Sequence, residues 1–316
     1  MTSNHRIDVH HHILPPHYIE TVGAHAIAVQ GSSGRVPTWA LDHALEGMDG
    51  AGIQTAITSL SAPGLAQLPA APAQKLARWC NDFAAGMMQD HPGRFGMFAT
   101  LPVHDMDTCL QEVAYAYDTL GADGVCLLSN YAGRYLGDES LRPLYEELDR
   151  RKAVVFVHPT SPQHMVQISQ LSASTLEFPF DTARTAASLV FGGVTRDFPA
   201  IRWILSHAGG ALPYLCGRVE VLTTNNPTLR ERIPDGFEAE LAKFYFDTAL
   251  SANAMAMNAL AGLASTGHIL FGTDYPFGPK GQMLQAAQGL DAIGWTEEDT
   301  DKVRHGNAQL LFPRLA

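Results

Sequence analysis

Short apolar, β-prone runs recur along the chain and alternate with stretches whose apolar residues are spaced three and four apart. Most of the short runs are continuously apolar, as strands buried on both faces are. The eight runs are residues 6–14, 55–60, 95–101, 124–128, 153–158, 201–207, 244–248 and 269–274. The longer stretches carry one apolar face, which is typical of amphipathic helices. The pattern therefore predicts eight strands with helices between them.

Two helical stretches illustrate the spacing. Residues 73–88 place an apolar side chain at every third or fourth position, and residues 140–148 do the same. Ser140 is a plausible N-cap for the second helix. Pro143 then lies near the helix start, where a missing backbone N–H costs little.

Strands and helices that alternate eight times predict a (β/α)8 TIM barrel, as a single domain over residues 1–316. A doubly wound open sheet is the alternative, but no GxGxxG follows the first strand. Residues 15–48 separate the first two strands by more than one helix requires. We expect this segment, with Gly-Ser-Ser-Gly at 31–34, to be an insertion after the first strand, over the barrel mouth.

Composition and charge exclude several classes of protein. Of the 316 residues, 46% are apolar and 17% are charged, which fits a large core. A net charge of −11 argues against nucleic acid or an anionic membrane as a partner. No run of 18 apolar residues and no signal-like leader occurs. The four cysteines have no CxxC spacing, so we expect reduced thiols and a cytoplasmic location.

The first strand contains three consecutive histidines. Side chains alternate along a strand, so Asp8, His10 and His12 are expected on one face, and Val9 and His11 on the other. Two imidazoles one step apart on one face can chelate a metal ion. A tag remnant or a solvated histidine cluster is the alternative. We favour the metal because the histidines lie inside a β-prone run, not in a Gly/Ser linker.

Further candidate ligands appear when the same question is asked of the other strands. Functional residues of such barrels lie at the C-terminal ends of the strands. That rule selects His10, His12, His158, His207 and Asp274. Each has an ordinary reading alone, as a strand end, a turn histidine or a capping aspartate. Their coincidence predicts a mononuclear metal site, for which zinc, iron, nickel and manganese are suitable and zinc is the default.

Five segments together resemble a known family. They are DVHHH at 8–12, VHP at 157–159, SHAGGALP at 206–213, FGTDYPF at 271–277 and HGNA at 305–308. In this order they resemble the amidohydrolase superfamily, and within it the branch of aminocarboxymuconate semialdehyde decarboxylase and the salicylate- and resorcylate-type decarboxylases. The resemblance extends from residue 6 to about 312. The HxH motif by itself would not be specific.

The resemblance implies a role for each candidate residue. His10, His12, His158 and Asp274 would bind one divalent metal ion, with zinc expected and manganese as the alternative. His207 would be an unliganded catalytic histidine, hydrogen-bonded to metal-bound water or to substrate. Asp274 would share in catalysis as a proton-carrying group.

The resemblance also implies a homodimer. The family places an arginine eleven residues after the catalytic histidine, where it holds a substrate carboxylate in the neighbouring subunit's site. The corresponding residue is Arg218. Without the resemblance, Arg218 would be read as an ordinary arginine on a helix surface.

One departure from the family pattern narrows the substrate. The namesake decarboxylase has an arginine four residues before its Met-Asp pair, where it grips a second carboxylate. This chain has Ala44 at that position, before Met48 and Asp49. We therefore expect a small monocarboxylic aromatic acid, such as a 2-hydroxybenzoate or an alkylated relative. Aromatic residues that offer a suitable pocket are Trp39, Phe178, Phe180, Tyr275 and Phe277.

These expectations converge on a non-oxidative decarboxylase, a carbon–carbon lyase. A divalent metal can chelate a carboxylate and an ortho hydroxyl, while His207 or Asp274 supplies a proton to the ring carbon. A hydrolase or hydratase is the alternative, in which the metal lowers the pKa of its water, Asp274 takes the proton and His207 stabilises an oxyanion. A non-enzymatic metal protein is the third possibility. His207, which is surplus to four ligands, argues against it.

Overall fold

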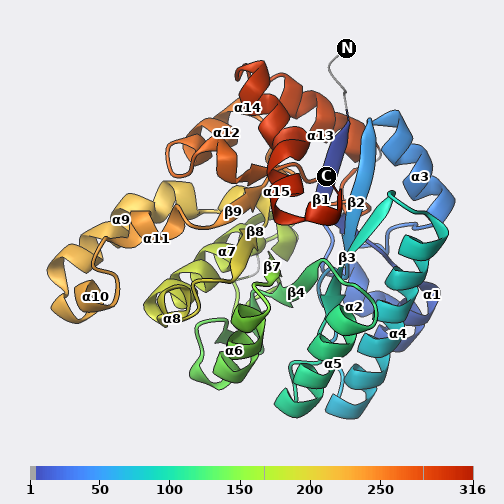
Figure 1. The fold of residues 1–316 in the computed structure, drawn as a ribbon, viewed down its shortest axis with the longest axis horizontal. Helices are drawn as coiled ribbons and strands as arrows, with labels where there is room; N and C mark the ends of the chain where they lie inside the picture. Colours follow the sequence, from blue (N-terminus) through green and yellow to red (C-terminus); the bar gives the residue numbers. More distant parts are fainter. Residues whose placement is uncertain (1–4, 167, 280, 316) are drawn as a thin grey trace.

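In the computed structural model, which describes residues 5–166, 168–279 and 281–315, eight parallel strands form one sheet that curls into a barrel (Figure 1). In spatial order they are β1 (Arg6–His12), β2 (Ile53–Ser59), β3 (Phe95–Thr100), β4 (Gly124–Leu128), β7 (Val154–His158), β8 (Arg202–Leu205), β9 (Tyr245–Asp247) and β10 (Ile269–Leu270). The chain after β10 returns to β1, where the Val9 N–H donates to the Phe271 carbonyl and His11 pairs with Tyr275. The predicted (β/α)8 TIM barrel is confirmed.

Helices surround the strands, and a small antiparallel pair, β5 (Asn130–Tyr131) and β6 (Arg134–Tyr135), follows β4. The helices are α1 (Pro16–Val22), α2 (Ala24–Ala28), α3 (Leu41–Gly50), α4 (Ala70–Asp90), α5 (Met106–Asp118), α6 (Arg142–Arg150), α7 (Ala173–Phe191), α8 (Val194–Asp197), α9 (Leu212–Asn225), α10 (Pro227–Arg232), α11 (Phe237–Leu241), α12 (Ala254–Ala261), α13 (Gln282–Asp291), α14 (Glu297–Asp301) and α15 (Asn307–Leu311). In Figure 1, α9, α10 and α11 extend away from the barrel, at the left of the view.

Each of the eight predicted strands is present, with ends that differ by a few residues. The helix predicted over residues 73–88 is α4, and Pro143 lies in the first turn of α6 as expected. The prediction that Ser140 caps α6 is wrong. A 3-10 turn over Glu139–Leu141 precedes α6, and the carboxylate of Asp138 caps that turn by accepting the Ser140 N–H at 2.9 Å. An acidic N-cap two residues earlier therefore satisfies the free backbone donors.

The core has two layers, one inside the barrel and one between the strands and the helices. The inner layer consists of Ile7, Val9, Ile57, Phe98, Cys126, Val154, Phe156, Ile204 and Leu270, closed at one end by Ala308 and Phe312. The outer layer is larger and includes the apolar face of α6, where Leu144, Tyr145 and Leu148 are fully buried. The inner layer fills the lower half of the barrel interior, toward the N-terminal ends of the strands. The upper half, at the C-terminal ends of the strands, is therefore free to hold a site.

The insertion after the first strand lies at the barrel mouth. It contains α1, α2 and the connection to α3, and residues 30–32 of this connection border a cavity together with His158 and Asp274. The cavity opens at the C-terminal ends of the strands, where barrel sites are built. The predicted location of the insertion is confirmed.

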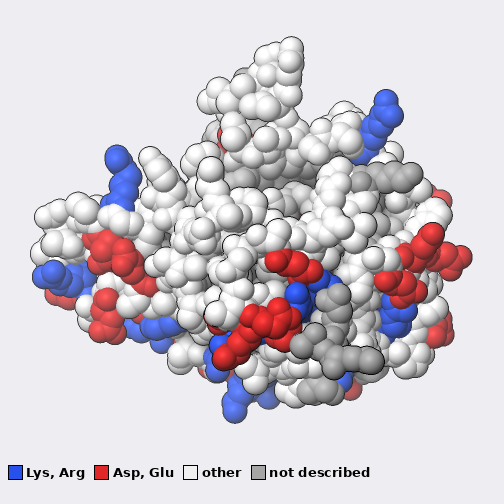
Figure 2. Space-filling view, turned by 90° about the horizontal axis from the view of Figure 1, so that it is seen from above, with Lys and Arg blue, Asp and Glu red and all other residues white. Residues whose placement is uncertain are grey.

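The surface carries both signs of charge. On the face shown in Figure 2, acidic and basic side chains lie around a broad uncharged area. Some large apolar side chains are exposed between β7 and α7, namely Met165, Val166, Ile168 and Leu171. None of the helices in the described part of the chain is long and apolar enough to cross a membrane.

Candidate metal centre

A β-bulge in β1 aims His10 and His12 into the barrel. The pairing of β1 with β2 shifts by one residue between Asp8 and His11, as in a bulge. As a result the neighbours Val9 and His10 both face the interior: Val9 belongs to the inner layer, and the His10 ring lies edge-on to Phe156, with centroids 4.9 Å apart. The interior face of β1 thus changes from apolar to imidazole within one step.

The bulge overturns the expectation that Asp8 shares a face with His10 and His12. The Asp8 carboxylate instead accepts hydrogen bonds from the Thr273 hydroxyl at 2.6 Å and from the Thr273 backbone N–H at 3.1 Å. It also lies 3.0 Å from Nδ1 of His11, whose ring packs against Tyr275. Asp8 and His11 therefore join β1 to the segment after β10, outside the ring of candidate ligands.

Four side chains converge above the inner layer. One ligand atom from each of His10, His12, His158 and Asp274 lies within 4.8 Å of all the others, and all four residues are buried. Nε2 of His10 is 3.0 Å from Nε2 of His12, and each is 3.2 Å from Oδ1 of Asp274. Neighbouring ligand atoms of a bound zinc ion lie roughly 3 Å apart, since Zn–N distances are about 2.0–2.1 Å.

Each imidazole is oriented from its far side. Nδ1 of His10 donates to the Asp247 carboxylate at 2.8 Å, and Nδ1 of His158 donates to the Pro159 carbonyl at 2.7 Å. Nδ1 of His12 is 3.0 Å from the Ser59 hydroxyl. Because a carboxylate and a carbonyl can only accept, His10 and His158 carry a proton on Nδ1, and in its neutral form each ring presents a lone pair at Nε2.

A cation fits this arrangement better than protein atoms alone do. Oδ1 of Asp274 is buried and has no hydrogen-bond partner within the described residues, although two imidazole Nε2 atoms face it. Lone pairs that converge at about 3 Å repel one another unless a proton or a metal ion lies between them. The donor set of three imidazoles and one carboxylate is suitable for zinc or manganese.

The local electrostatics also favour positive charge at this point. Burial lowers the pKa of His10, but Asp247 and Asp274 outweigh that effect and raise it to about 10. Burial lowers the pKa of His12 to about 4, and burial with the neighbouring His12 and His10 lowers the pKa of His158 well below its usual value. The negative charges of Asp247 and Asp274 thus favour a proton on His10. The same negative charges would attract a divalent cation to the cluster.

The segment after β10 brings Asp274 to the cluster. Its backbone N–H donates to the His10 carbonyl at 2.8 Å, and Asp274 itself has a left-handed φ of 61°. Gly272 allows the close approach: a Cβ there would lie 2.9 Å from Cβ of His10 and 3.1 Å from Cβ of Asp247. Any other residue at 272 would push these strands apart.

His207 lies at the open side of the cluster. β8 ends at Leu205, and His207 begins a 3-10 turn in which its φ is 55°. Its Nε2 is 3.4 Å from Oδ2 of Asp274, the oxygen that points away from His10 and His12. Its buried Nδ1 has no partner among the described residues. Position 210, three residues later, requires glycine because a Cβ there would lie 2.2 Å from the Pro179 carbonyl oxygen of α7.

Asp247 is a site residue that the sequence reasoning missed. It ends β9 and is fully buried, with Oδ2 on His10 and Oδ1 accepting the backbone N–H groups of His207 and Ala249 at 3.0 and 2.9 Å. One carboxylate thus orients a candidate ligand and the turn that carries His207. The strand-end rule could have found it, because Asp247 lies one residue before the end of the seventh predicted strand.

A cavity of about 360 Å³ opens beside the cluster. His158, His207 and Asp274 form its floor, Phe178, Pro179, Leu250 and Phe277 form apolar walls, and Gln30, Gly31 and Ser32 lie at the mouth. Phe277 lies edge-on to His12 and Phe178 edge-on to His158, with ring centroids 5.6 and 6.1 Å apart. No described residue that lines the cavity is a lysine or an arginine.

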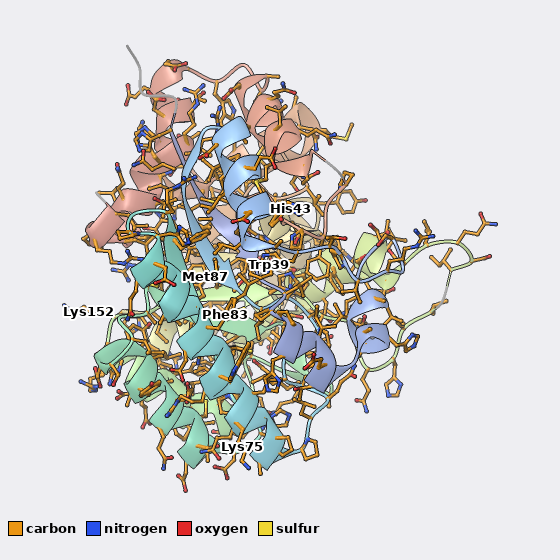
Figure 3. The ribbon with its side chains drawn as sticks, turned by 90° about the vertical axis from the view of Figure 1, so that its right-hand side faces the viewer. Trp39, His43, Lys75, Phe83, Met87 and Lys152 are labelled. Carbon is orange, nitrogen blue, oxygen red and sulfur yellow. The ribbon has the colours of Figure 1, made fainter. Side chains whose placement is uncertain are left out.

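Only two of the five aromatic residues predicted for the pocket border it. They are Phe178 and Phe277. Trp39 instead packs against Phe83 of α4, with ring centroids 5.9 Å apart, as Figure 3 shows from the side. Tyr275 faces His11, and Phe180 is exposed at the surface. The presence of an aromatic residue near a sequence motif therefore does not by itself predict that its side chain lines the cavity.

Arg218 lies outside the cavity. It is exposed on α9, and no ion pair is formed by it within the described part of the chain. The same helix also exposes Tyr214, Val221 and Leu222, and it projects from the barrel in Figure 1. Within a single chain, Arg218 is therefore not brought together with the other candidate site residues.

Comparisons with known proteins agree with this geometry. The model of the amidohydrolase family matches residues 7–314. The 6-methylsalicylic acid decarboxylase of Aspergillus aculeatus is 39% identical over 321 residues, which cover 98% of this chain and 96% of the relative.

Two solved structures have similar folds. One is an amidohydrolase with a TM-score of 0.90 and 27% identity, covering 98% of this chain and 99% of that chain. The other is a dihydroxybenzoic acid decarboxylase from Polaromonas, which has bound manganese and the inhibitor 2-nitroresorcinol. Its TM-score is 0.81 at 24% identity, with 98% of this chain and 97% of that chain covered.

Proposed function

We propose, since the chain belongs to the amidohydrolase family and to its branch of salicylate- and resorcylate-type decarboxylases, that it catalyses the non-oxidative decarboxylation of a small aromatic acid. The substrate class is a 2-hydroxybenzoate or an alkylated relative. One observation carries the proposal: His158 and Asp274 of the three-histidine, one-aspartate cluster line a cavity whose other lining residues include two phenylalanines, a proline and a leucine. Such walls suit an aromatic ring, and the cluster suits its carboxylate.

His10, His12, His158 and Asp274 would hold one divalent ion, zinc by default and manganese as the alternative. When bound, the ion supplies a Lewis acid that stabilises anionic charge on the carboxylate and the ortho hydroxyl of the acid. We expect about one ion per chain, as in mononuclear sites of this ligand type. Elemental analysis of active protein measures this number, and active protein without metal would refute the assignment.

His207 is the residue to which we assign the proton transfer. In the reaction the bond between the ring and the carboxyl carbon breaks, its electron pair stays on the ring carbon, carbon dioxide leaves, and a proton is added to the ring. Burial raises the pKa of Asp274, but the charge of His10 and the contacts with the imidazoles of His10, His12 and His207 lower it well below the usual range. Asp274 is therefore ionised, and it orients His207 as the proton donor.

The role of His207 is tested by His207→Ala. We expect turnover to fall by roughly 10²- to 10⁴-fold, the usual contribution of a positioned acid, while metal content stays at the wild-type level. A variant that loses its metal would show that His207 is itself a ligand.

The function is tested with a panel of hydroxybenzoates, dicarboxylates and lactones, assayed with zinc- and manganese-loaded protein. The proposal expects release of carbon dioxide from a 2-hydroxybenzoate without any added organic cofactor. Release of acid from a lactone, with no carbon dioxide from any benzoate, would instead identify a hydrolase. A hydrolase is the second candidate because the same cluster can activate water.

We also propose that two copies of this barrel domain associate and that Arg218 of each copy binds a carboxylate in the other copy's cavity. Three observations support this: the cavity lacks a cationic lining residue, Arg218 is exposed, and α9 exposes Tyr214, Val221 and Leu222 beside it. The apolar side chains of residues 165, 166, 168 and 171, on the segment that projects at the right of Figure 3, would be covered in the same contact.

Native mass measurement and Arg218→Ala test the dimer. We expect a dimer, and a rise in KM with kcat changed less, because the variant keeps the metal cluster. A fully active monomer would refute the proposal.

The four buried, unpaired cysteines are consistent with the reducing cytoplasm that we propose as the location.

A further inference from the structure

Gln30 is the most buried polar side chain that the insertion brings to the cavity mouth. It follows α2, and its backbone N–H donates to the Ile27 carbonyl at 3.1 Å. The residue is 8% exposed and borders the cavity. The next residue, Gly31, lies against the Phe277 ring, since a Cβ there would be 3.5 Å from Cδ1 of Phe277. The insertion thus closes over one aromatic wall and holds Gln30 at its edge.

One end of the Gln30 amide is anchored. Its Oε1 accepts a hydrogen bond from the Ser161 hydroxyl at 3.4 Å, and Ser161 lies just after β7, the strand that ends in His158. The Ser161 carbonyl in turn accepts from Nδ2 of Asn130 at 3.5 Å. No described residue accepts a hydrogen bond from Nε2 of Gln30. The anchor therefore leaves two N–H donors of a largely buried amide for a molecule in the cavity.

A hydroxybenzoate presents more acceptors than the metal cluster can hold. It has two carboxylate oxygens and a phenolic oxygen, and no lysine or arginine of the same chain is among the described residues that line the cavity. A buried acceptor without a donor is costly, so an oxygen that points toward the mouth requires a partner. An amide supplies that donor without the positive charge that would favour a second carboxylate on the substrate.

We infer that Gln30 is a substrate-binding residue, whose amide N–H groups donate to an oxygen of the aromatic acid that the metal ligands do not hold. The inference rests on the proposed function and extends it. The neutral amide at the mouth makes the cavity selective for acids with one carboxylate and with hydroxyl or alkyl substituents. Ser161 is a positioning residue, because it acts by orienting the Gln30 amide.

Gln30→Glu tests the inference, because it replaces the N–H donors with carboxylate oxygens of nearly the same shape. We expect KM for the preferred hydroxybenzoate to rise roughly 10- to 100-fold, with kcat changed less than about threefold and metal content unchanged. Gln288→Glu, on the exposed face of α13, adds the same charge away from the cavity and should leave KM unchanged. Ser161→Ala keeps the amide but removes its anchor, so it should raise KM by a smaller factor.

Direct binding of 2-nitroresorcinol separates this inference from the proposed function. Wild-type protein should bind this compound, and Gln30→Glu should weaken binding at least tenfold with metal content intact. If the wild type decarboxylates no acid of the panel but this difference in binding persists, the proposed function fails and the role of Gln30 stands. If KM and binding in Gln30→Glu match those of Gln288→Glu, or if the variant loses its metal, the role of Gln30 is refuted.

Discussion

The upper and lower halves of the barrel interior are built from the same strands for opposite purposes. Along β7, Val154 and Phe156 belong to the apolar inner layer, whereas His158, the next inward residue, belongs to the metal cluster. Along β1, Val9 lies in the lower half and His10 in the upper half. Along each of these strands, the side chains that face the interior change from apolar packing to a cluster of ionisable groups within one or two residues.

The difference between the halves explains how the cluster can be both polar and rigid. The apolar inner layer excludes water from the side of the cluster that faces the lower half, and charges interact more strongly where water is excluded. Close packing under the imidazoles also limits their motion, which is a condition for a preorganised site. The two halves should therefore respond differently to mutation: the upper half should determine chemistry and the lower half stability.

The largest expected effect is that of removing a ligand in the upper half. His12→Ala should bind metal poorly and lose turnover by roughly 10³-fold or more, since a bound metal supplies several kcal/mol of transition-state stabilisation. Its metal-free form should unfold at nearly the same denaturant concentration as metal-free wild type. Activity assays, elemental analysis and urea unfolding with a chelator measure these quantities. Wild-type activity in the variant would remove His12 from the ligand set.

The next effect belongs to the lower half. Phe98 is buried in the inner layer, where it stacks on Phe156 with ring centroids 5.3 Å apart. Phe98→Ala should lower the free energy of unfolding by about 3–5 kcal/mol, the usual cost of removing a buried phenyl ring. Activity per folded molecule should stay within a factor of a few, measured at low temperature against the folded fraction. A folded variant that binds no metal would contradict the division into halves.

Much of this division was predictable from the sequence. All eight strands were found because strands buried on both faces are continuously apolar. The four clustered residues lie near or just after the C-terminal ends of strands, as the barrel rule requires. The face of Asp8 was predicted wrongly, because alternation assumes a regular strand and the bulge is set by pairing with β2. No local pattern in the first strand reveals that extra residue.

Other features depended on tertiary contacts. Trp39 packs on Phe83 because the insertion folds against α4, and an aromatic residue in a loop gives no sign of which partner it will find. Gln30 lies at the mouth because the insertion turns back toward β7, where Ser161 meets it. Asp247 was within reach of the strand-end rule but was passed over, since carboxylates that support ligands resemble ordinary strand-end residues.

Asp247 offers a smaller test within the upper half. Asp247→Asn keeps an oxygen that can accept the His207 and Ala249 N–H groups, but it removes the charge that faces His10. Metal affinity should fall by about 10- to 100-fold, as is typical when the partner of a ligating histidine is changed. Titration with a competing chelator measures this. Asp123→Asn is the matched control, because Asp123 pairs with Arg314, on which no candidate ligand depends. Equal affinities in both variants would show that Asp247 does not support the site.

The smallest effect should come from the boundary between the halves. Phe156 touches both, with its ring stacked on Phe98 and edge-on to His10. Phe156→Leu keeps the site apolar and should lower the free energy of unfolding by about 1 kcal/mol, because it removes only part of a buried apolar side chain. Metal affinity should change less than threefold, because the hydrogen bond from Nδ1 to Asp247, not the contact with the phenyl ring, orients His10. Ile204→Val, deeper in the inner layer, should lower the free energy of unfolding by a similar amount, about 0.5–1.5 kcal/mol, and should leave metal affinity unchanged. A tenfold loss of metal affinity in Phe156→Leu alone would mean that the inner layer positions the ligands directly. The upper and lower halves would then not respond separately to mutation.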